Sequence, residues 1–337
     1  IGGTGVVGRL HGRAGAGRRI GLRAELDALP MTEASGLPYT SQIPDRFHGC
    51  GHDGHSVTLL TAACHLAETR DFAGTLHVIF QPAEELLTGA AAMIDDGLFD
   101  RFPVDRVYGL HSMPGLPLGH VATRAGPITA SEALFEIVIA ARGGHAALPH
   151  MGVDAITVGA EVVGALQTIV SRKLDPAMNG VVSVTGFETD GARNVLPGRA
   201  WLTGDCRALT PEVNDRIETS MRRIVDGICA AHEVGATVGY ETIFPPTIND
   251  ADAVKAAARA ADGVADKVDA DCAPKLFSED FAHMAGAVPG AFLLLGNGTE
   301  GSHARPLHSA DYDFNDAALE TGRALWVALV EQELRAD

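Results

Sequence analysis

The stretch TLHVIFQPAEE, residues 75–85, joins a short apolar run to two adjacent acids, Glu84 and Glu85. Its first seven residues are rich in β-branched and aromatic side chains, which favours a β-strand. Pro82 cannot continue a strand ladder, so the strand ends there and the acids follow at its carboxyl end. The stretch therefore predicts a strand that delivers two carboxylates to one edge of a sheet.

The same pattern recurs along the chain. RIGLRAELD (19–27) and DRVYGLH (105–111) are short apolar strands that end in polar residues, and AFLLLGNG (291–298) is a later one. Segments with apolar residues at helical spacing, at 55–70 and 84–99, lie between the strands. Strands that alternate with helices predict an α/β catalytic domain, with a mixed sheet flanked by helices. In such sheets ligands gather at the carboxyl ends of the strands.

The middle of the chain has a different order. It predicts strand, helix, strand, strand, helix and strand, which is the ferredoxin-like βαββαβ unit. We therefore expect a catalytic domain over 1–130 and 245–337, interrupted by an inserted domain over 131–244. The strands of the insertion are expected at 133–141, 180–189, 199–208 and 236–244, and its helices at 154–170 and 212–233.

Composition excludes several classes of protein. The net charge of −17 argues against nucleic acid or an anionic membrane as the main partner. No apolar run approaches the roughly 18 residues needed to span a bilayer. Five scattered cysteines, an odd number, do not form a disulfide framework, which favours a reducing cytoplasm.

A glycine motif near the start is misleading. Residues 3–8 match G-x-G-x-x-G, the dinucleotide-binding pattern. That pattern requires a strand before the glycines and a helix after them, and neither is indicated. The segment over 6–26 instead predicts two short strands with a glycine-rich turn between them.

FHGCGHDGHS, residues 47–56, concentrates histidine, cysteine and aspartate between glycines. Cys50 and His52 lie on one flexible turn before a predicted helix, with spacing that directs both side chains to the same side. Asp53 is a candidate N-cap of that helix. His48 and His55 are expected to have supporting roles.

Side chains of the types that bind hydrolytic metals occur at four places where the sheet would bring them together. Taken singly each has an ordinary explanation, such as a small buried thiol or acids that favour a helix N-terminus. The candidates are Cys50 and His52, Glu84 and Glu85, His111, and His308 in PLHSADYDFND.

Nine strings occur here in one order: LRAELDALP, FHGCGHDGHS, FQPAEE, GLHSMPGLP, GGHAALPH, NVLPG, SEDF, PGAFLLLGNG and LHSADYDFND. Together they resemble the N-acyl-amino-acid amidohydrolases, which include hippurate hydrolases, aminoacylases and auxin-conjugate hydrolases, within a wider group of dinuclear metallopeptidases. The resemblance covers essentially the whole chain. It implies two divalent ions per subunit (zinc, manganese, cobalt or nickel), and a homodimer through the inserted domain, which would serve as lid and dimerisation surface.

The resemblance also implies roles for single residues. Glu84 is the general base, Asp27 and Asp53 support the metals, and the metal ligands are Cys50, His52, Glu85, His111 and His308. His145 would contact the substrate carbonyl, often in the partner subunit's site, although a polar turn residue is the alternative. Asn194 and Arg207 would bind the substrate. Asn194 could equally be a turn residue, and the alternative for Arg207 is a surface ion pair.

Three departures from the family pattern affect these expectations. Members carry a further segment before IGGTGVVG, so its absence here indicates truncation or processing. EELLTG replaces the usual glycine-rich turn after QPAEE, which would reshape one wall of the pocket. Phe277-Ser278 replaces the usual Met-Gly before the late acidic motif, which would alter acyl specificity.

The expected activity is hydrolysis of the amide bond in an N-acyl amino acid, such as an N-benzoyl or N-acetyl compound, with a metal-bridged water. A dipeptidase, or an N-acetyl-diaminopimelate deacetylase, is an alternative on the same fold. A non-catalytic binding protein is disfavoured, because it would not need the complete set of ligands and base.

Overall fold

The computed structural model describes residues 1–336 and divides them into two compact units. Unit 1 comprises residues 1–128, 247–274 and 279–336, and unit 2 comprises 129–246 and 275–278. Residues 275–278 thus return to unit 2, although the sequence boundaries place them in the other domain; Ala130 N donates to Phe277 O there (3.0 Å). No helix within 1–336 is long and apolar enough to cross a membrane.

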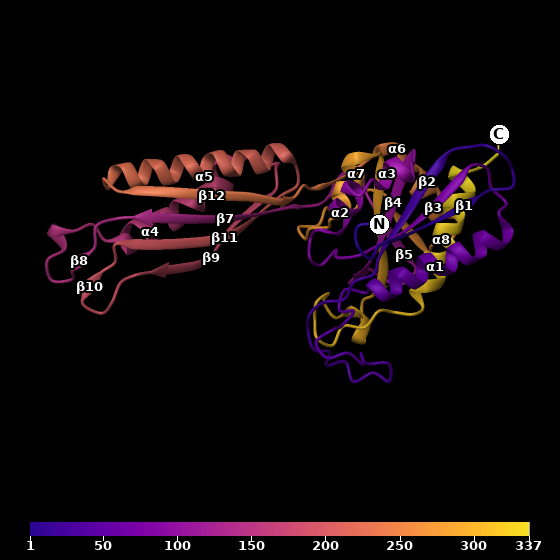
Figure 1. Cartoon of the computed structure of the whole chain (residues 1–337), viewed down its shortest axis with the longest axis horizontal. Coiled ribbons are helices and arrows are strands. Elements are labelled where there is room, and N and C mark those ends of the chain that lie inside the picture. The colour runs from indigo at the N-terminus through magenta and orange to yellow at the C-terminus, as the bar shows by residue number, and fades with distance from the viewer. Residues whose placement is uncertain (337) are drawn as a thin grey trace. The chain divides into compact units, whose positions relative to one another are not determined.

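Unit 1 is built on a seven-stranded mixed sheet of order β1-β3-β2-β4-β15-β5-β14 (Figure 1). The neighbours β3, β2, β4 and β15 run parallel to one another, while β1 and β5 run antiparallel to their partners β3 and β15. The strands are β1 Val6–His11, β2 Arg19–Glu25, β3 Thr75–Gln81, β4 Arg106–Pro114, β5 His120–Ala122, β14 Lys267–Asp269 and β15 Gly290–Gly298.

Helices cover both faces of this sheet. Alternate residues of β15 face opposite sides: Leu293 joins the core formed with α1, α6 and α8, whereas Phe292 contacts Phe281 of α7. α2 packs beside α7. The helices are α1 His52–Thr69, α2 Gly89–Asp95, α3 Leu98–Arg101, α6 Ala251–Asp262, α7 Phe281–Ala287 and α8 Ala318–Glu333.

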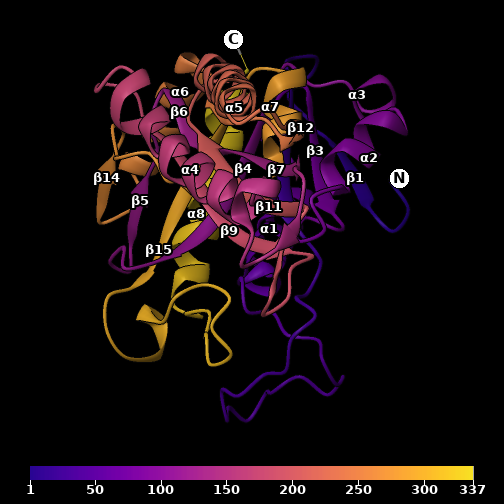
Figure 2. The ribbon, with the colours of Figure 1, turned by 90° about the vertical axis from the view of Figure 1, so that its left-hand side faces the viewer.

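Unit 2 is a four-stranded antiparallel sheet of order β12-β7-β11-β9, with α4 and α5 packed on one face (Figure 2). Its chain order is βαββαβ, the expected ferredoxin-like unit. A small ribbon, β8 with β10, extends from it, and β6 pairs with β13 where the chain passes between the units. The elements of unit 2 are β7 Ser131–Ala140, β8 Gly144–His145, α4 Ala155–Leu166, β9 Gly180–Thr189, β10 Val195–Leu196, β11 Arg199–Ala208, α5 Pro211–Ala231 and β12 Gly235–Phe244. β6 Gly126–Thr129, except for its last residue, and β13 Thr247–Asn249 belong to unit 1.

The predicted fold class is confirmed. Of two local predictions, the strands after the glycine motif are confirmed and the helix over 84–99 is wrong. The glycine motif near the start leads into β1 and then β2, as expected, with no helix between them. The single helix expected over 84–99 is wrong: residues 84–87 form a turn, and α2 and α3 are separate. The physical reason is the backbone, because Leu87 (φ 62°) and Gly97 (φ 80°) both adopt left-handed conformations, which an α-helix cannot contain.

Candidate metal centre and its buried support

The candidate site lies in unit 1, at the carboxyl ends of the parallel strands. Cys50 Sγ lies 3.4 Å from His111 Nε2 and 3.3 Å from His308 Nε2. His111 Nδ1 lies 2.7 Å from the carbonyl oxygen of Ser112, so that nitrogen carries the proton and Nε2 presents a lone pair. Burial and the nearby charges of Glu85 and Glu84 raise the pKa of the Cys50 thiol. A thiolate here therefore requires a cation beside it.

His52 is oriented by Asp27. Its Nδ1 donates toward Asp27, 3.1 Å from the carbonyl oxygen and 3.2 Å from Oδ1, so Nε2 points the other way. That Nε2 lies 3.9 Å from both Glu84 Oε2 and Glu85 Oε1. Burial by itself lowers the pKa of His52. The hydrogen bond to Asp27 and the charges of Glu25, Asp27 and Glu85 outweigh this effect and raise the pKa to about 9. The point between these groups therefore favours positive charge, which a proton or a metal ion supplies.

Asp27 also positions the second acid, because its Oδ2 accepts the backbone N–H of Glu85 (2.9 Å). Glu85 Oε1 lies 3.4 Å from His308 Nε2. Two atoms of this group, Glu85 Oε1 and His52 Nε2, are buried and make no hydrogen bond. Buried polar atoms rarely lack a hydrogen-bond partner. Imidazole, thiolate and carboxylate groups together suit zinc and related divalent ions. The donor set therefore fits a metal.

The structure brings together all five side chains predicted as ligands: Cys50, His52, Glu85, His111 and His308. The backbone of His308 is left-handed (φ 63°), and its N–H donates to the Gly49 carbonyl oxygen (2.8 Å). An unusual backbone conformation at a side chain of this kind is typical of functional sites.

Glu84 lies beside this group and is buried. Its carboxylate is close to those of Glu279 and Asp280. Burial, followed by the charges of Glu279 and Asp280, raises the pKa of Glu84 well above its ordinary value, although Arg23 opposes the shift. A carboxylate with a raised pKa accepts a proton more readily, which suits a general base.

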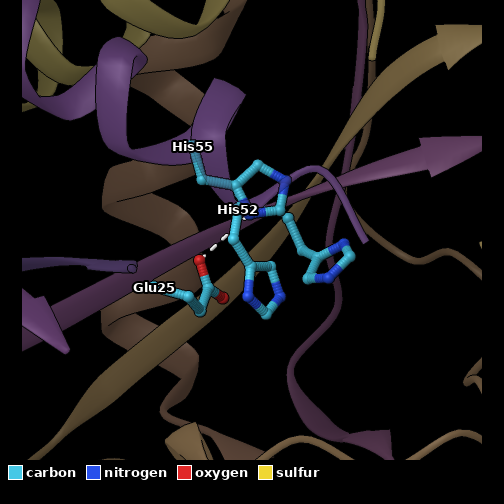
Figure 3. Close-up of side chains that lie close together, drawn as sticks. Glu25, His52 and His55 are labelled. Carbon is cyan, nitrogen blue, oxygen red and sulfur yellow. Dashed lines mark hydrogen bonds and ion pairs between the residues drawn. The ribbon is translucent and has the colours of Figure 1, made fainter. Parts of the chain in front are cut away.

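Sequence reasoning missed a layer of buried charge beneath the site. The backbone N–H of Ser112 donates to His55 Nε2 (2.8 Å), so His55 Nδ1 carries the proton and donates to Glu25 Oε2 (3.0 Å). Figure 3 shows the carboxylate of Glu25 facing His55 and His52 from one side. Arg23, fully buried, forms ion pairs with Glu25, Glu279 and Asp280. The sequence did contain a signal for this buried charge. Arg23 and Glu25 lie inside LRAEL, a strand whose other residues are suited to burial on both faces.

Asp53 does not cap the helix as predicted. α1 begins at His52, its N-cap residue is Gly51, and no side chain caps it. Asp53 already lies in the first turn, where its Oδ1 accepts the N–H of the neighbouring Gly54 (2.9 Å). Its supporting role stays a prediction. His48 lies partly buried just before the site, and its Nδ1 has no hydrogen bond.

The three remaining candidates lie in unit 2. His145 on β8 pairs with Val195 on β10, which places it beside Asn194, and both side chains are exposed. Arg207 lies near the other end of β11, where it forms ion pairs with Glu132 (3.0 Å) and Asp205 (2.9 Å). The ion-pair alternative for Arg207 is thus observed, and its role toward substrate stays a prediction. Ser278, from the Phe277-Ser278 departure, accepts a hydrogen bond from Arg207 Nη1.

Comparison with known proteins identifies the chain's relatives. The model of Peptidase family M20/M25/M40 matches residues 21–332. A hippurate hydrolase of Campylobacter jejuni is 36% identical over 99% of this chain and 86% of its own length. An N-acetylcysteine deacetylase of Bacillus subtilis is 34% identical over 97% and 86%.

A solved structure leads to the same group. A dinuclear metal binding peptidase of the M20 family from Bacillus subtilis superposes with a TM-score of 0.85 at 29% identity, covering 99% of this chain and 86% of that one. The match over nearly the whole chain supports a hydrolase of amide bonds, with residues suited to divalent metal. The chain therefore belongs to Peptidase family M20/M25/M40 as a metal-dependent amidohydrolase.

Proposed function

We propose that this amidohydrolase releases a free amino acid from an N-acyl conjugate, with two divalent ions at the site in unit 1. The observation that carries the proposal is the convergence of five potential ligands around Cys50, together with two buried atoms, on His52 and Glu85, that make no hydrogen bond. In this proposal the side chains that would hold the ions are Cys50, His52, Glu85, His111 and His308.

Bound divalent ions would supply Lewis acidity toward the scissile carbonyl and a water molecule. Glu84 accepts the proton of the attacking water and then passes it to the leaving amine. Its raised pKa favours the first of these transfers. Asp27 accepts a hydrogen bond from the His52 ring through one carboxylate oxygen and from the Glu85 backbone through the other. These two bonds hold the base and the ligands in fixed positions relative to one another.

We further propose that His145 serves the partner subunit's site in a homodimer. Arg199 and Arg207 are eight residues apart on β11, about 26 Å at strand rise. His145 and Asn194 lie beyond the first end and Arg207 near the second, so one small substrate cannot touch both within one unit 2. A second copy would allow both groups to act on one substrate.

The exposed edge of unit 2 supports a partner there. β9 is an edge strand of the sheet, and Phe187 on it is 40% exposed. Phe187 lies over Gly159 of α4, where an added Cβ would be 2.6 Å from its ring, and Ile156 on the same helix is 46% exposed. An unpaired edge flanked by apolar side chains is suited to pairing with another chain.

We also propose that the enzyme acts in the cytoplasm. All five cysteines are free. A reducing compartment would keep the buried Cys50 thiol available to metal.

A substrate panel on metal-reconstituted protein tests the activity. We expect N-benzoyl and N-acetyl amino acids to be hydrolysed, and turnover to stop with a chelator and return with metal. Preference for dipeptides, or for N-acetyl-diaminopimelate, would support the alternative enzymes. Binding without hydrolysis of any compound would support the non-catalytic alternative.

Two variants separate the base from the ligands. Glu84→Gln should keep its metal and lose turnover by about 10²- to 10⁴-fold, the usual contribution of a general base. Cys50→Ala should instead lose metal, measured as ions per subunit. Parent-like turnover in the first variant, or full metal content in the second, would reject the assigned role.

A further inference from the structure

The 82–89 loop runs from the end of β3 to the first residue of α2 and carries both Glu84 and Glu85. Its backbone is held in an unusual shape: Ala83 (φ 52°) and Leu87 (φ 62°) are both left-handed without being glycine. Side chains disfavour this region, so such a loop keeps its shape only where surrounding groups fix it. The question is which groups do so.

Asp280 contacts both ends of the loop. Gln81, the last residue of β3, donates its Nε2 to both carboxylate oxygens of Asp280 (2.7 and 2.8 Å). The backbone N–H of Ala90, in the first turn of α2, donates to Oδ2 (2.9 Å). One fully buried carboxylate therefore joins the residue just before the loop to the residue just after it.

The side chain of Asp280 does not cap its own helix, α7. Asp280 occupies the N-cap position of α7, where an aspartate ordinarily accepts a backbone N–H of the first turn, yet its side chain makes no capping bond. Glu279 Oε1 accepts the Phe281 N–H instead (3.0 Å). The carboxylate of Asp280 is turned toward the loop, and Arg23 Nη2 holds its Oδ1 from behind (2.8 Å). α7 and α2 lie side by side, so the side chain of Asp280 is close enough to contact the start of α2 (Figure 1).

We propose that Asp280 is a positioning residue that clamps the 82–89 loop and so fixes Glu84 relative to its ligand neighbour Glu85. Gln81, Ala90 and Arg23 all donate hydrogen bonds to it, so only a group with two acceptor oxygens satisfies them. The inference rests on the proposed role of Glu84 for its catalytic consequence. The clamp itself stands on geometry alone.

Asp280→Asn is the sharpest substitution, because it keeps the shape of the side chain. An amide has one acceptor oxygen, and its NH₂ would face a donor in either orientation. Asp250→Asn is the matched control: Asp250 Oδ1 accepts the N–H groups of Asp252 (3.0 Å) and Ala253 (2.8 Å) at the start of α6, with no contact to the loop. Both variants remove one charge and weaken contacts between a carboxylate and backbone N–H groups, one such contact at Asp280 and two at Asp250.

Amide hydrogen exchange of peptides over 83–90 is the first readout, since it does not depend on activity. We expect Asp280→Asn to speed exchange there by about tenfold, with exchange in α6 unchanged, and Asp250→Asn to show the reverse. Unchanged exchange over 83–90 in Asp280→Asn would overturn the clamp.

The second readout is kinetic, on metal-loaded protein. A misplaced base should lower kcat by about 10- to 100-fold with a smaller change in KM, while Asp250→Asn keeps the parent kcat. Adding Asp280→Asn to Glu84→Gln should cause no further loss, because the base is already absent. A full additional loss in the double variant would overturn positioning through Glu84. Faster loop exchange combined with an active Glu84→Gln variant would leave the clamp standing and reject the proposed base.

Discussion

Single residues decide where the proposed ligands point. Gly51 stands between Cys50 and His52 with a left-handed backbone (φ 83°), and a Cβ there would lie 2.7 Å from Ser112 Oγ and from Tyr312 Oη. Those two hydroxyls are themselves hydrogen-bonded to each other (3.0 Å). The residue types of the site were predictable from sequence, because metal chemistry restricts them. The close approach of Ser112 and Tyr312, which requires glycine at position 51, could not be predicted from the sequence.

Gly51→Ala should therefore damage the site as well as the fold. The added methyl group must displace the Ser112–Tyr312 pair and occupy a backbone region that costs about 1–2 kcal/mol for alanine. We expect lower metal content per subunit and lower turnover. Gly36→Ala is the control, since Gly36 is also left-handed (φ 69°) but has open space around it. Equal metal loss in both variants would mean that backbone strain, rather than contact with the pair, is responsible.

At the scale of elements, the central position of β2 explains the charge that sequence analysis overlooked. β2 lies between β3 and β4, so residues of both its faces are buried. Arg23 and Glu25 are tolerated there because each has oppositely charged partners. The strand was predictable from its apolar pattern. The partners were not, because Glu279 and Asp280 are more than 250 positions away in the chain.

β3 supplies a pH-dependent test of stability. Its His77 is buried against Phe102, opposite Arg9 of β1. Burial, followed by the charge of Arg9, lowers the pKa of His77 from about 6.5 to about 4. Between those values the unfolded chain binds a proton that the folded chain does not, so the free energy of unfolding falls as the solution is acidified.

His77→Gln removes this proton uptake. From pH 7 to pH 4, its free energy of unfolding should fall by about 3 kcal/mol less than that of the parent protein. Urea unfolding of the metal-free protein at several pH values measures the difference. His65→Gln, at a partly exposed position on α1, controls for the loss of an imidazole. A pH slope in His77→Gln equal to the parent's would contradict the expectation.

At the scale of the whole molecule, the proposed ligands and base belong to unit 1, whereas His145, Asn194 and Arg207 belong to unit 2. The βαββαβ order of unit 2 was predictable because each element has its own periodicity. The separation of His145 from Arg207 emerges only when the strands are paired. It is this separation that supports a site completed by a second copy.

Mixing two inactive variants tests that arrangement. His145→Ala and Glu84→Gln should each be inactive alone. If His145 acts across the dimer, a mixed dimer has one complete site, so subunit exchange should restore about a quarter of the parent activity. If His145 acts within its own subunit, no mixture recovers activity. A dimer disrupted by Phe187→Arg should also fail to recover, which ties the effect to the β9 edge.

The sequence by itself determined the strands, the inserted βαββαβ unit and the residue types of a metal centre, because these depend on local periodicity and on ligand chemistry. The tertiary structure decided what surrounds them: the start of α1 at His52 after a left-handed Gly51, the broken helix after Glu85, and the buried charges that connect Arg23 to Asp280. Those features arise from contacts between segments far apart in the chain. No local pattern encodes them, because a buried charge is stable only beside partners that folding brings to it.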